Sequence, residues 1–273
     1  MFTRYFEDCF QFSWLLAVLL CACYTPPVFS ATGSDTESIK TGGVIALASH
    51  LPNYIILDPE QNVLKFQISV RKRLYQDHLY FAYTQESYWD LASKSLPFIE
   101  SNYNPDIFWD VEHRGDETAG YHHRFGIEHE SNGLDGINSR SWNRAYFKLD
   151  YAFEPDRARV GQAVIRQFLI EKRHNFSVKL WNGFEIAKEN PDIEKYYGNF
   201  QLGYRFGDQK TGVGLSSRFA ASGRWRSSQL DLLFMIPGSD IFSYVQVWNG
   251  YAESLLRFNQ DVRIARLGFL FEL

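Results

Sequence analysis

The feature that most constrains the fold is the alternation of apolar and polar residues in short segments along most of the chain. From about residue 53 onward, apolar side chains recur at every second position, and turn residues such as Asn132-Gly133 and Pro237-Gly238 separate the segments. A period of two is typical of β-strands, whose successive side chains point to opposite faces. The expected strands lie near 65–70, 79–83, 105–112, 121–131, 140–152, 159–170, 174–184, 196–206, 211–221, 227–236, 241–251 and 261–273. The chain is therefore expected to be all-β, with about twelve strands.

Composition distinguishes between a soluble and a membrane-embedded sheet. Aromatic residues make up 17% of the 273 residues, and the mean hydropathy is only −0.30. After residue 30 no apolar run reaches the roughly 18 residues of a membrane helix. A transmembrane antiparallel β-barrel reconciles these facts, since only every second strand residue faces lipid and aromatic girdles flank the bilayer. A soluble β-sandwich or barrel, for example an exported hydrolase, would show the same alternation.

The two ends of the chain favour the membrane barrel. Residues 1–30 are typical of an export signal, with an apolar core at Trp14–Cys23 and a cleavage site after Ser30. The acidic residues near its start leave open that the true start lies further along. At the other end, Leu267, Phe269, Phe271 and Leu273 alternate to the last residue. An even strand number would place both ends of the barrel on the periplasmic side.

The expected organisation is a signal peptide at 1–30, a flexible lead-in at 31–49 and the barrel at 50–273. All three cysteines lie in the leader, so a chain cleaved after Ser30 has no disulfides. Lipidation of Cys23 is an alternative use of the leader. The net charge of −4 is small and mixed in sign, which gives no support to a nucleic-acid partner.

Chemistry concentrates in one segment, HESNGLDGINSRSWN at residues 129–143. His129 and Ser131 are two residues apart, so on a strand they share a face with Ile127. Asn143 shares a face with Phe147 on the next expected strand. In a membrane barrel an apolar face meets lipid. A nucleophile, a base and an orienting amide would then lie against the bilayer, where the ester bonds of phospholipids are found.

This segment resembles the active-site segment of the outer membrane phospholipase A family, in which His-x-Ser-Asn-Gly is followed by Ser-Arg-Ser-Trp-Asn. The similarity extends over roughly residues 50–273 and includes Lys65-Phe66-Gln67, Tyr83-Thr84-Gln85, Asn190-Pro191-Asp192 and Gly250–Leu255. The resemblance implies a twelve-stranded barrel in the outer membrane of a Gram-negative bacterium. It also implies calcium-dependent phospholipase A1/A2 activity on phospholipids and lysophospholipids, activated by reversible formation of a homodimer.

The resemblance assigns a role to each matched residue. Ser131 would be the nucleophile, His129 the general base and Asn143 the residue that orients the imidazole. The backbone N–H of Gly133 would stabilise the oxyanion, and Gln85 would lie at the dimer interface within the membrane. Calcium would be held by the Ser139 side chain, by the Leu134 carbonyl and by the Ser95 carbonyl of a second copy. The family commonly has arginine where Leu134 stands, a change that a backbone ligand tolerates.

A barrel without enzymatic activity, such as a small porin or a structural protein, is the alternative from another functional class. How far side chains fill the lumen distinguishes a porin from the enzyme, because a porin needs an open lumen. The strand faces opposite to the catalytic ones carry charged side chains, which are expected to fill the lumen and leave little room for solutes. These residues are Arg124, Glu128, Glu130, Arg144, Lys148 and Asp150.

Overall fold

A computed structural model of the chain describes residues 47–76, 78–114, 119–154 and 172–271. The expected signal peptide, nearly all of the lead-in and the expected strand at 159–170 lie outside these residues. Contacts divide the chain into Met1–Ile45 and Ala46–Leu273, and only the second unit contains described residues.

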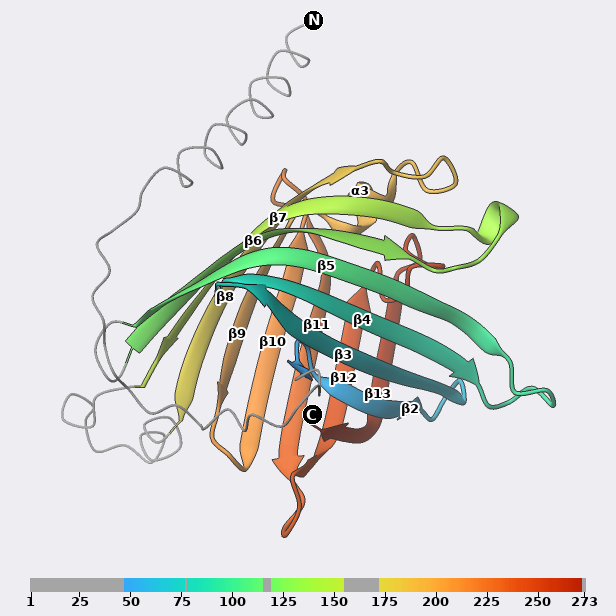
Figure 1. Cartoon of the computed structure of the whole chain (residues 1–273). Helices are drawn as coiled ribbons and strands as arrows, with labels where there is room; N and C mark the ends of the chain where they lie inside the picture. The colour runs from blue at the N-terminus through green and yellow to red at the C-terminus, as the bar shows by residue number, and fades with distance from the viewer. Residues whose placement is uncertain (1–46, 77, 115–118, 155–171, 272–273) are drawn as a thin grey trace, which may run out of the picture. The chain divides into compact units, whose positions relative to one another are not determined.

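Twelve antiparallel strands close into a barrel (Figure 1). They are β2 (Asn53–Asp58), β3 (Val63–Tyr75), β4 (Leu79–Asp90), β5 (Phe98–Arg114), β6 (Ala119–Ser131), β7 (Ser141–Phe153), β8 (Arg173–Phe184), β9 (Phe200–Gly207), β10 (Thr211–Phe219), β11 (Trp225–Met235), β12 (Ile241–Gly250) and β13 (Val262–Phe271). Closure occurs where β2 pairs with both β3 and β13. A short β1 (Ala48–Ser49) pairs with β3 further along its length.

The predicted all-β barrel of about twelve strands is thus confirmed, although one of the twelve observed strands is not among those expected. Strand β2 completes the described barrel, whereas the expected strand at 159–170 falls outside the described residues. The expected strand at 196–206 begins later, at Phe200, because the short helix α3 (Ile193–Tyr197) precedes it.

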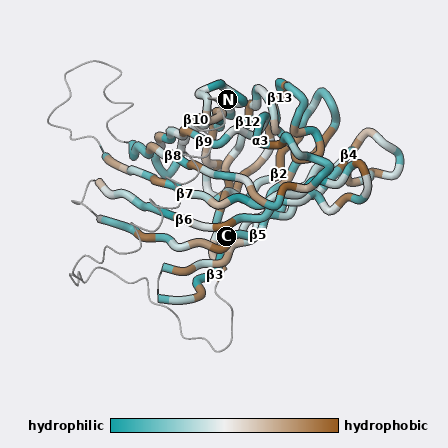
Figure 2. Tube along the Cα trace, turned by 90° about the horizontal axis from the view of Figure 1, so that it is seen from above, coloured by the Kyte–Doolittle hydropathy of each residue, from teal (hydrophilic) through white to brown (hydrophobic). Residues whose placement is uncertain are grey.

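Alternation along the strands separates an apolar outer surface from a polar lumen. On β6 and β13 the outward residues Phe125, Ile127 and Leu267 are 40%, 52% and 57% exposed, although all three are large and apolar. Figure 2 shows hydrophobic and hydrophilic residues mixed along the strands. This pattern is that of a barrel wall in lipid. No helix in the described part of the chain is long and apolar enough to cross a membrane.

Ion pairs fill the lumen. The buried Glu128 carboxylate contacts Arg144 at 2.9 Å and Lys179 at 2.8 Å, and Arg144 also contacts Glu130 at 2.9 Å. Arg124 pairs with Asp110 on the neighbouring strand β5. Large aromatic residues, including the fully buried Trp142, pack among these charges. Lys148 contacts Asp150 at 2.8 Å, so each charged residue expected inside the barrel has a partner of opposite charge, as buried charges require.

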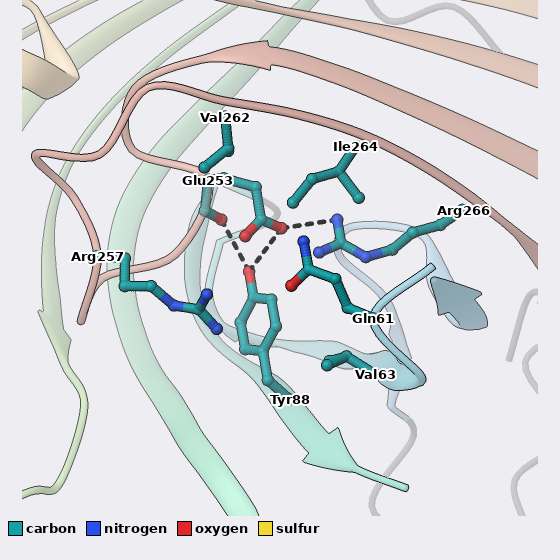
Figure 3. A pocket seen from close by; sticks show the side chains of 8 residues that line it. All are labelled: Gln61, Val63, Tyr88, Glu253, Arg257, Val262, Ile264 and Arg266. Carbon is teal, nitrogen blue, oxygen red and sulfur yellow. Dashed lines mark hydrogen bonds and ion pairs between the residues drawn. The ribbon is translucent and has the colours of Figure 1, made fainter. Parts of the chain in front are cut away.

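The connection between β12 and β13, residues 251–261, adds to this filling (Figure 3). Its Glu253 carboxylate lies 2.7 Å from Arg266 and 3.3 Å from Lys65, and its backbone carbonyl accepts a hydrogen bond from Tyr88. Burial alone would raise the pKa of Glu253, but Lys65 and Arg266 outweigh it and hold the pKa below its ordinary value. Leu255 of the same connection is fully buried. Within the described residues, buried side chains of the wall and of this connection therefore pack the lumen.

Strand order places the candidate site at one end of the barrel. The connection between β6 and β7 lies at the same end as those at 91–97, 185–199 and 251–261. The turns at 208–210 and 236–240 lie at the opposite end, and so do the first and last described residues, 47 and 271. Short turns and chain ends are typical of the periplasmic side of such barrels.

Candidate functional site

The centre of the site is a hydrogen bond between neighbouring strands. His129 on β6 lies directly opposite Asn143 on β7 in the sheet register. The Nδ1 atom of His129 is 2.8 Å from the Oδ1 atom of Asn143. Both side chains share the outward parity of the exposed Ile127. The pair therefore lies on the outer wall of the barrel, close to the end of the strands.

Ser131 is the last residue of β6 and follows His129 on the same face. It pairs with Ser141 on β7 and with Tyr103 on β5. Within the described residues, the Ser131 hydroxyl and the His129 ring make no hydrogen bond with each other. In enzymes, catalytic hydrogen bonds are often long or poorly aligned without substrate and tighten when substrate binds.

A buried asparagine shapes the loop that follows Ser131. Asn132 is only 2% exposed. Its side-chain oxygen accepts hydrogen bonds from the N–H groups of Arg140, at 2.9 Å, and Leu134, at 3.3 Å, while its amide donates to the Asn138 carbonyl at 2.9 Å. These three bonds tie the start of the loop at 132–140 to its end. Together with the Arg140 guanidinium, which donates to the Ile137 and Ser139 carbonyls, the Asn132 side chain holds the loop, and β7 begins in register with β6.

Gly133 occupies a position that other residues fill poorly. Its φ of 63° lies in the left-handed region, and a Cβ atom added there would lie 2.7 Å from the Tyr103 ring. Among the described residues its backbone N–H has no hydrogen-bond partner. This N–H is therefore available to an incoming oxygen, two residues from Ser131.

The loop also carries the residues expected to hold calcium. Leu134 and Ser139 are both half-buried, on either side of a short 3-10 turn at Gly136–Asn138. The described residues contain no group of three or more His, Cys, Asp or Glu side chains suited to a metal. A serine hydroxyl and a main-chain carbonyl are, however, the hard oxygen donors that calcium accepts. Two such donors fit part of a calcium shell of six to eight oxygens and leave positions for water or for a second copy. Ser95 lies exposed in the connection at 91–97.

The connection at 185–199 supports the site from the side of β8. Asn190, which is fully buried, contacts both backbone groups of Ser141: its Oδ1 accepts from the N–H and its Nδ2 donates to the carbonyl, each at 3.2 Å. From the same connection, a Glu185 carboxylate oxygen accepts a hydrogen bond from Asn143 Nδ2 at 2.8 Å. On β5, Asn104 donates to the His129 carbonyl at 2.6 Å.

These supporting residues were not identified from the sequence. In the sequence Asn132 belongs to a turn signal and to the matched His-x-Ser-Asn-Gly motif, and Asn190 belongs to a matched tripeptide, but neither carries an expected role. Both belong to Asn-Gly or Asn-Pro pairs beside expected strands, which is the one signal that points to them. Glu185 carries no comparable signal.

Gln85 lies on the outer face of β4, with the parity of the exposed Phe81. Its amide accepts a hydrogen bond from the Tyr83 hydroxyl at 3.1 Å and donates one to Ser87 at 3.2 Å. In the register Gln85 pairs with Tyr103, which in turn pairs with Ser131. A polar band therefore runs along the outer wall from β4 to the candidate site.

Together, the fold and the site define a class of protein: an outer-membrane β-barrel with a packed lumen and a polar site on its lipid-facing wall. The family model described as Phospholipase A1 matches residues 41–271. The chain is 32% identical over 211 residues to Phospholipase A1 of Escherichia coli K12 and 30% identical over 217 residues to that of Proteus vulgaris. These alignments cover 72% and 75% of the chain, and 65% and 67% of the relatives. The aligned part thus spans slightly less than two thirds of the Escherichia coli protein.

Solved structures give the same result for the fold. The outer membrane phospholipase A from Escherichia coli aligns with a TM-score of 0.67 at 25% identity, over 82% of this chain and 98% of that structure. An outer membrane phospholipase dimer with bound calcium, from Salmonella typhi, aligns with a TM-score of 0.67 at 24% identity, over 83% and 92%. The chain belongs to the phospholipase A1 family.

Proposed function

We propose that the protein is a phospholipase A1/A2 that hydrolyses the acyl ester bonds of phospholipids and lysophospholipids at the outer wall of its barrel. The observation that carries the proposal is the hydrogen bond between His129 and Asn143 on the lipid-facing side, two residues from Ser131. A lipid ester reaches this surface without entering the lumen.

The proposed chemistry follows from which atoms donate and which accept. Asn143 Oδ1 only accepts, so the proton of His129 lies on Nδ1 and leaves Nε2 free as the base. Nε2 takes the Ser131 proton as Oγ attacks the acyl carbonyl carbon, and returns it to the leaving alcohol oxygen. Water then hydrolyses the acyl-enzyme by the same route. The Gly133 N–H would donate to the oxyanion in both steps.

Calcium and a second copy of the chain complete the proposal. The Ser139 hydroxyl and the Leu134 carbonyl would hold Ca²⁺, with the Ser95 carbonyl from the second copy. The bound ion would supply positive charge beside the ester oxygen. Gln85 would contact its counterpart across a reversible homodimer, which is consistent with the calcium-bound dimer of the Salmonella typhi relative. An amide contact of this kind within the membrane is worth about 0.6–2 kcal/mol.

The test is hydrolysis of phospholipid in detergent micelles by the folded barrel, compared with Ser131→Ala and with Ser139→Ala. Activity that requires Ser131, calcium and Ser139 is the expected result. Activity that persists with excess chelator would remove the metal assignments and retain the nucleophile. A folded, dimeric sample no more active than Ser131→Ala would favour the non-enzymatic barrel in its structural form, since the ion-paired lumen argues against a porin.

A further inference from the structure

Asn143 uses both ends of its amide, and only one end faces His129. Its Oδ1 meets His129 Nδ1 at 2.8 Å, while its Nδ2 donates to the carboxylate of Glu185 at 2.8 Å. An amide can turn over by exchanging its oxygen and nitrogen. A turned Asn143 would present N–H groups to His129 Nδ1 and favour the proton on Nε2, the atom that has to accept the Ser131 proton.

The Glu185 carboxylate prevents this exchange because an ionised carboxylate accepts hydrogen bonds and donates none. If the amide turned over, its oxygen would face the carboxylate, and two acceptors would be in contact. The observed orientation gives a charge-assisted hydrogen bond in their place. Glu185 thus selects the amide orientation, and the amide selects the tautomer.

The backbone at Glu185 indicates that the position is constrained. Its φ of 48° lies in the left-handed region, where residues other than glycine are uncommon. Glu185 follows Phe184, the last residue of β8, which lies directly opposite Asn143 in the register. Backbone strain of this kind is often found at functional sites. Here it brings the end of a flexible side chain to one atom of the orienting residue.

We infer that Glu185 is a positioning residue of the catalytic site: its carboxylate holds the Asn143 amide so that His129 carries its proton on Nδ1 and presents Nε2 to Ser131. The residue extends the Ser-His-Asn arrangement by a fourth member on the β8–β9 connection. The catalytic consequence of this inference rests on the proposed function. The effect of Glu185 on the His129 tautomer rests only on the hydrogen bonds His129–Asn143 and Asn143–Glu185.

The test compares Glu185→Ala, Glu185→Gln and Asn143→Ala, with Glu189→Ala as the control from the same connection. Glu185→Ala is expected to lower kcat about three- to tenfold with KM unchanged, the scale of one exposed charge-assisted hydrogen bond. Glu185→Gln keeps the side-chain length, but its amide can donate to Asn143 Oδ1 as well as accept from Nδ2, so it no longer selects one orientation and kcat is expected to fall by nearly as much as in Glu185→Ala. Glu189→Ala is expected to leave kcat unchanged.

Two further variants separate positioning from general stabilisation. The double variant of Glu185→Ala and Asn143→Ala is expected to be no less active than Asn143→Ala alone, because the two residues act through one path. Glu185→Gly relieves the backbone and removes the carboxylate, so it is expected to match Glu185→Ala in kcat while resisting unfolding at least as well as the parent. Additive losses in the double variant, a Glu185→Gln with the kcat of the parent, or a fully active Glu185→Ala would each overturn the inference.

A readout independent of hydrolysis is the ¹⁵N spectrum of the histidine rings, with the His129 signals assigned from His129→Ala. We expect the fraction of His129 with its proton on Nδ1 to fall in both Glu185→Ala and Glu185→Gln and to stay at the parent value in Glu189→Ala. An inactive protein that still shows this dependence would refute the proposed function and support the positioning role. An active protein whose His129 tautomer does not change in the Glu185 variants would support the proposed function and refute the positioning role.

Discussion

Replacing Gly133 by alanine tests the oxyanion assignment against a control in the same loop. Gly133 and Gly136 have nearly the same backbone conformation, with φ of 63° and 59°. A Cβ atom at Gly136 would meet nothing within 4 Å, whereas one at Gly133 would lie 2.7 Å from the Tyr103 ring. Both alanine substitutions therefore destabilise the loop by about 1–2 kcal/mol, because a residue with a Cβ disfavours the left-handed backbone. Only Gly133→Ala adds a steric clash with the Tyr103 ring.

The size of the expected loss follows from that contact. Ordinary contact begins near 3.4 Å, so the ring and the loop must separate by about 0.7 Å. A misplacement near 1 Å at a catalytic group costs up to about 100-fold, and removing one oxyanion donor costs about 100- to 1,000-fold. We expect Gly133→Ala to lose roughly 10- to 100-fold in kcat, and Gly136→Ala to lose less than about threefold.

The assay is the initial rate of phospholipid hydrolysis in mixed micelles, with folding verified by the gel mobility of unheated samples. Removing the ring in a Gly133→Ala, Tyr103→Ala double variant should recover most of the lost kcat. Equal activities of folded Gly133→Ala and Gly136→Ala would refute the reasoning, because they would show that the position of the Gly133 N–H does not affect the rate.

Three other predictions concern the loop, the lumen and the outer wall. Asn132→Ala removes three hydrogen bonds of the loop at 132–140 and should lower kcat at least tenfold, or roughly 1.4 kcal/mol, as measured in the same assay. The lowered pKa of Glu253 predicts stability that is present above the unfolded-state pKa of about 4.3 and lost as the pH falls through the folded-state pKa. Urea midpoints between pH 6 and 3 should therefore fall for the parent and change less for Glu253→Gln. That variant removes the carboxylate from the buried Arg266, while Lys65 keeps Glu86 at 3.2 Å, and it should cost about 3 kcal/mol at pH 6. Leu267→Arg, on the lipid-facing side of β13, should destabilise the barrel in bilayers by up to about 4 kcal/mol, measured by unfolding from vesicles.

Alternation was sufficient to predict the strands because it is a local property of each strand, whereas the aromatic content, the leader and the alternating last segment were needed to favour a membrane barrel over a soluble one. The same period of two assigned His129 and Asn143 to the outer wall and Arg144 to the lumen, as the register has them. The pairing of His129 with Asn143 required more than period, since it depends on the length of the loop between them. The family motif predicted that pairing, because it fixes the number of residues between the histidine and the asparagine.

Residues that act across long separations were not predictable in this way. Asn190 and Ser141 are 49 residues apart, and Glu185 and Asn143 are 42 apart, so no local pattern relates them. The late start of β9 has a similar cause. Ile193 and Tyr197 are spaced to bury one face of a helical turn against the lumen core, and Gly198 ends that turn with a φ of 80°. Tertiary burial overrides the strand preference of the tyrosines there.

The position of the His129–Asn143 pair on the outside of a filled barrel has a consequence for kinetics. Molecules that reach this wall travel laterally within one membrane leaflet, and the packed lumen offers them no second route. The concentration that governs encounter is then a number of molecules per unit area, not per unit volume. Diluting a lipid with inert detergent in the same micelle should slow its turnover, while diluting the micelles themselves in buffer should leave the rate per protein almost unchanged.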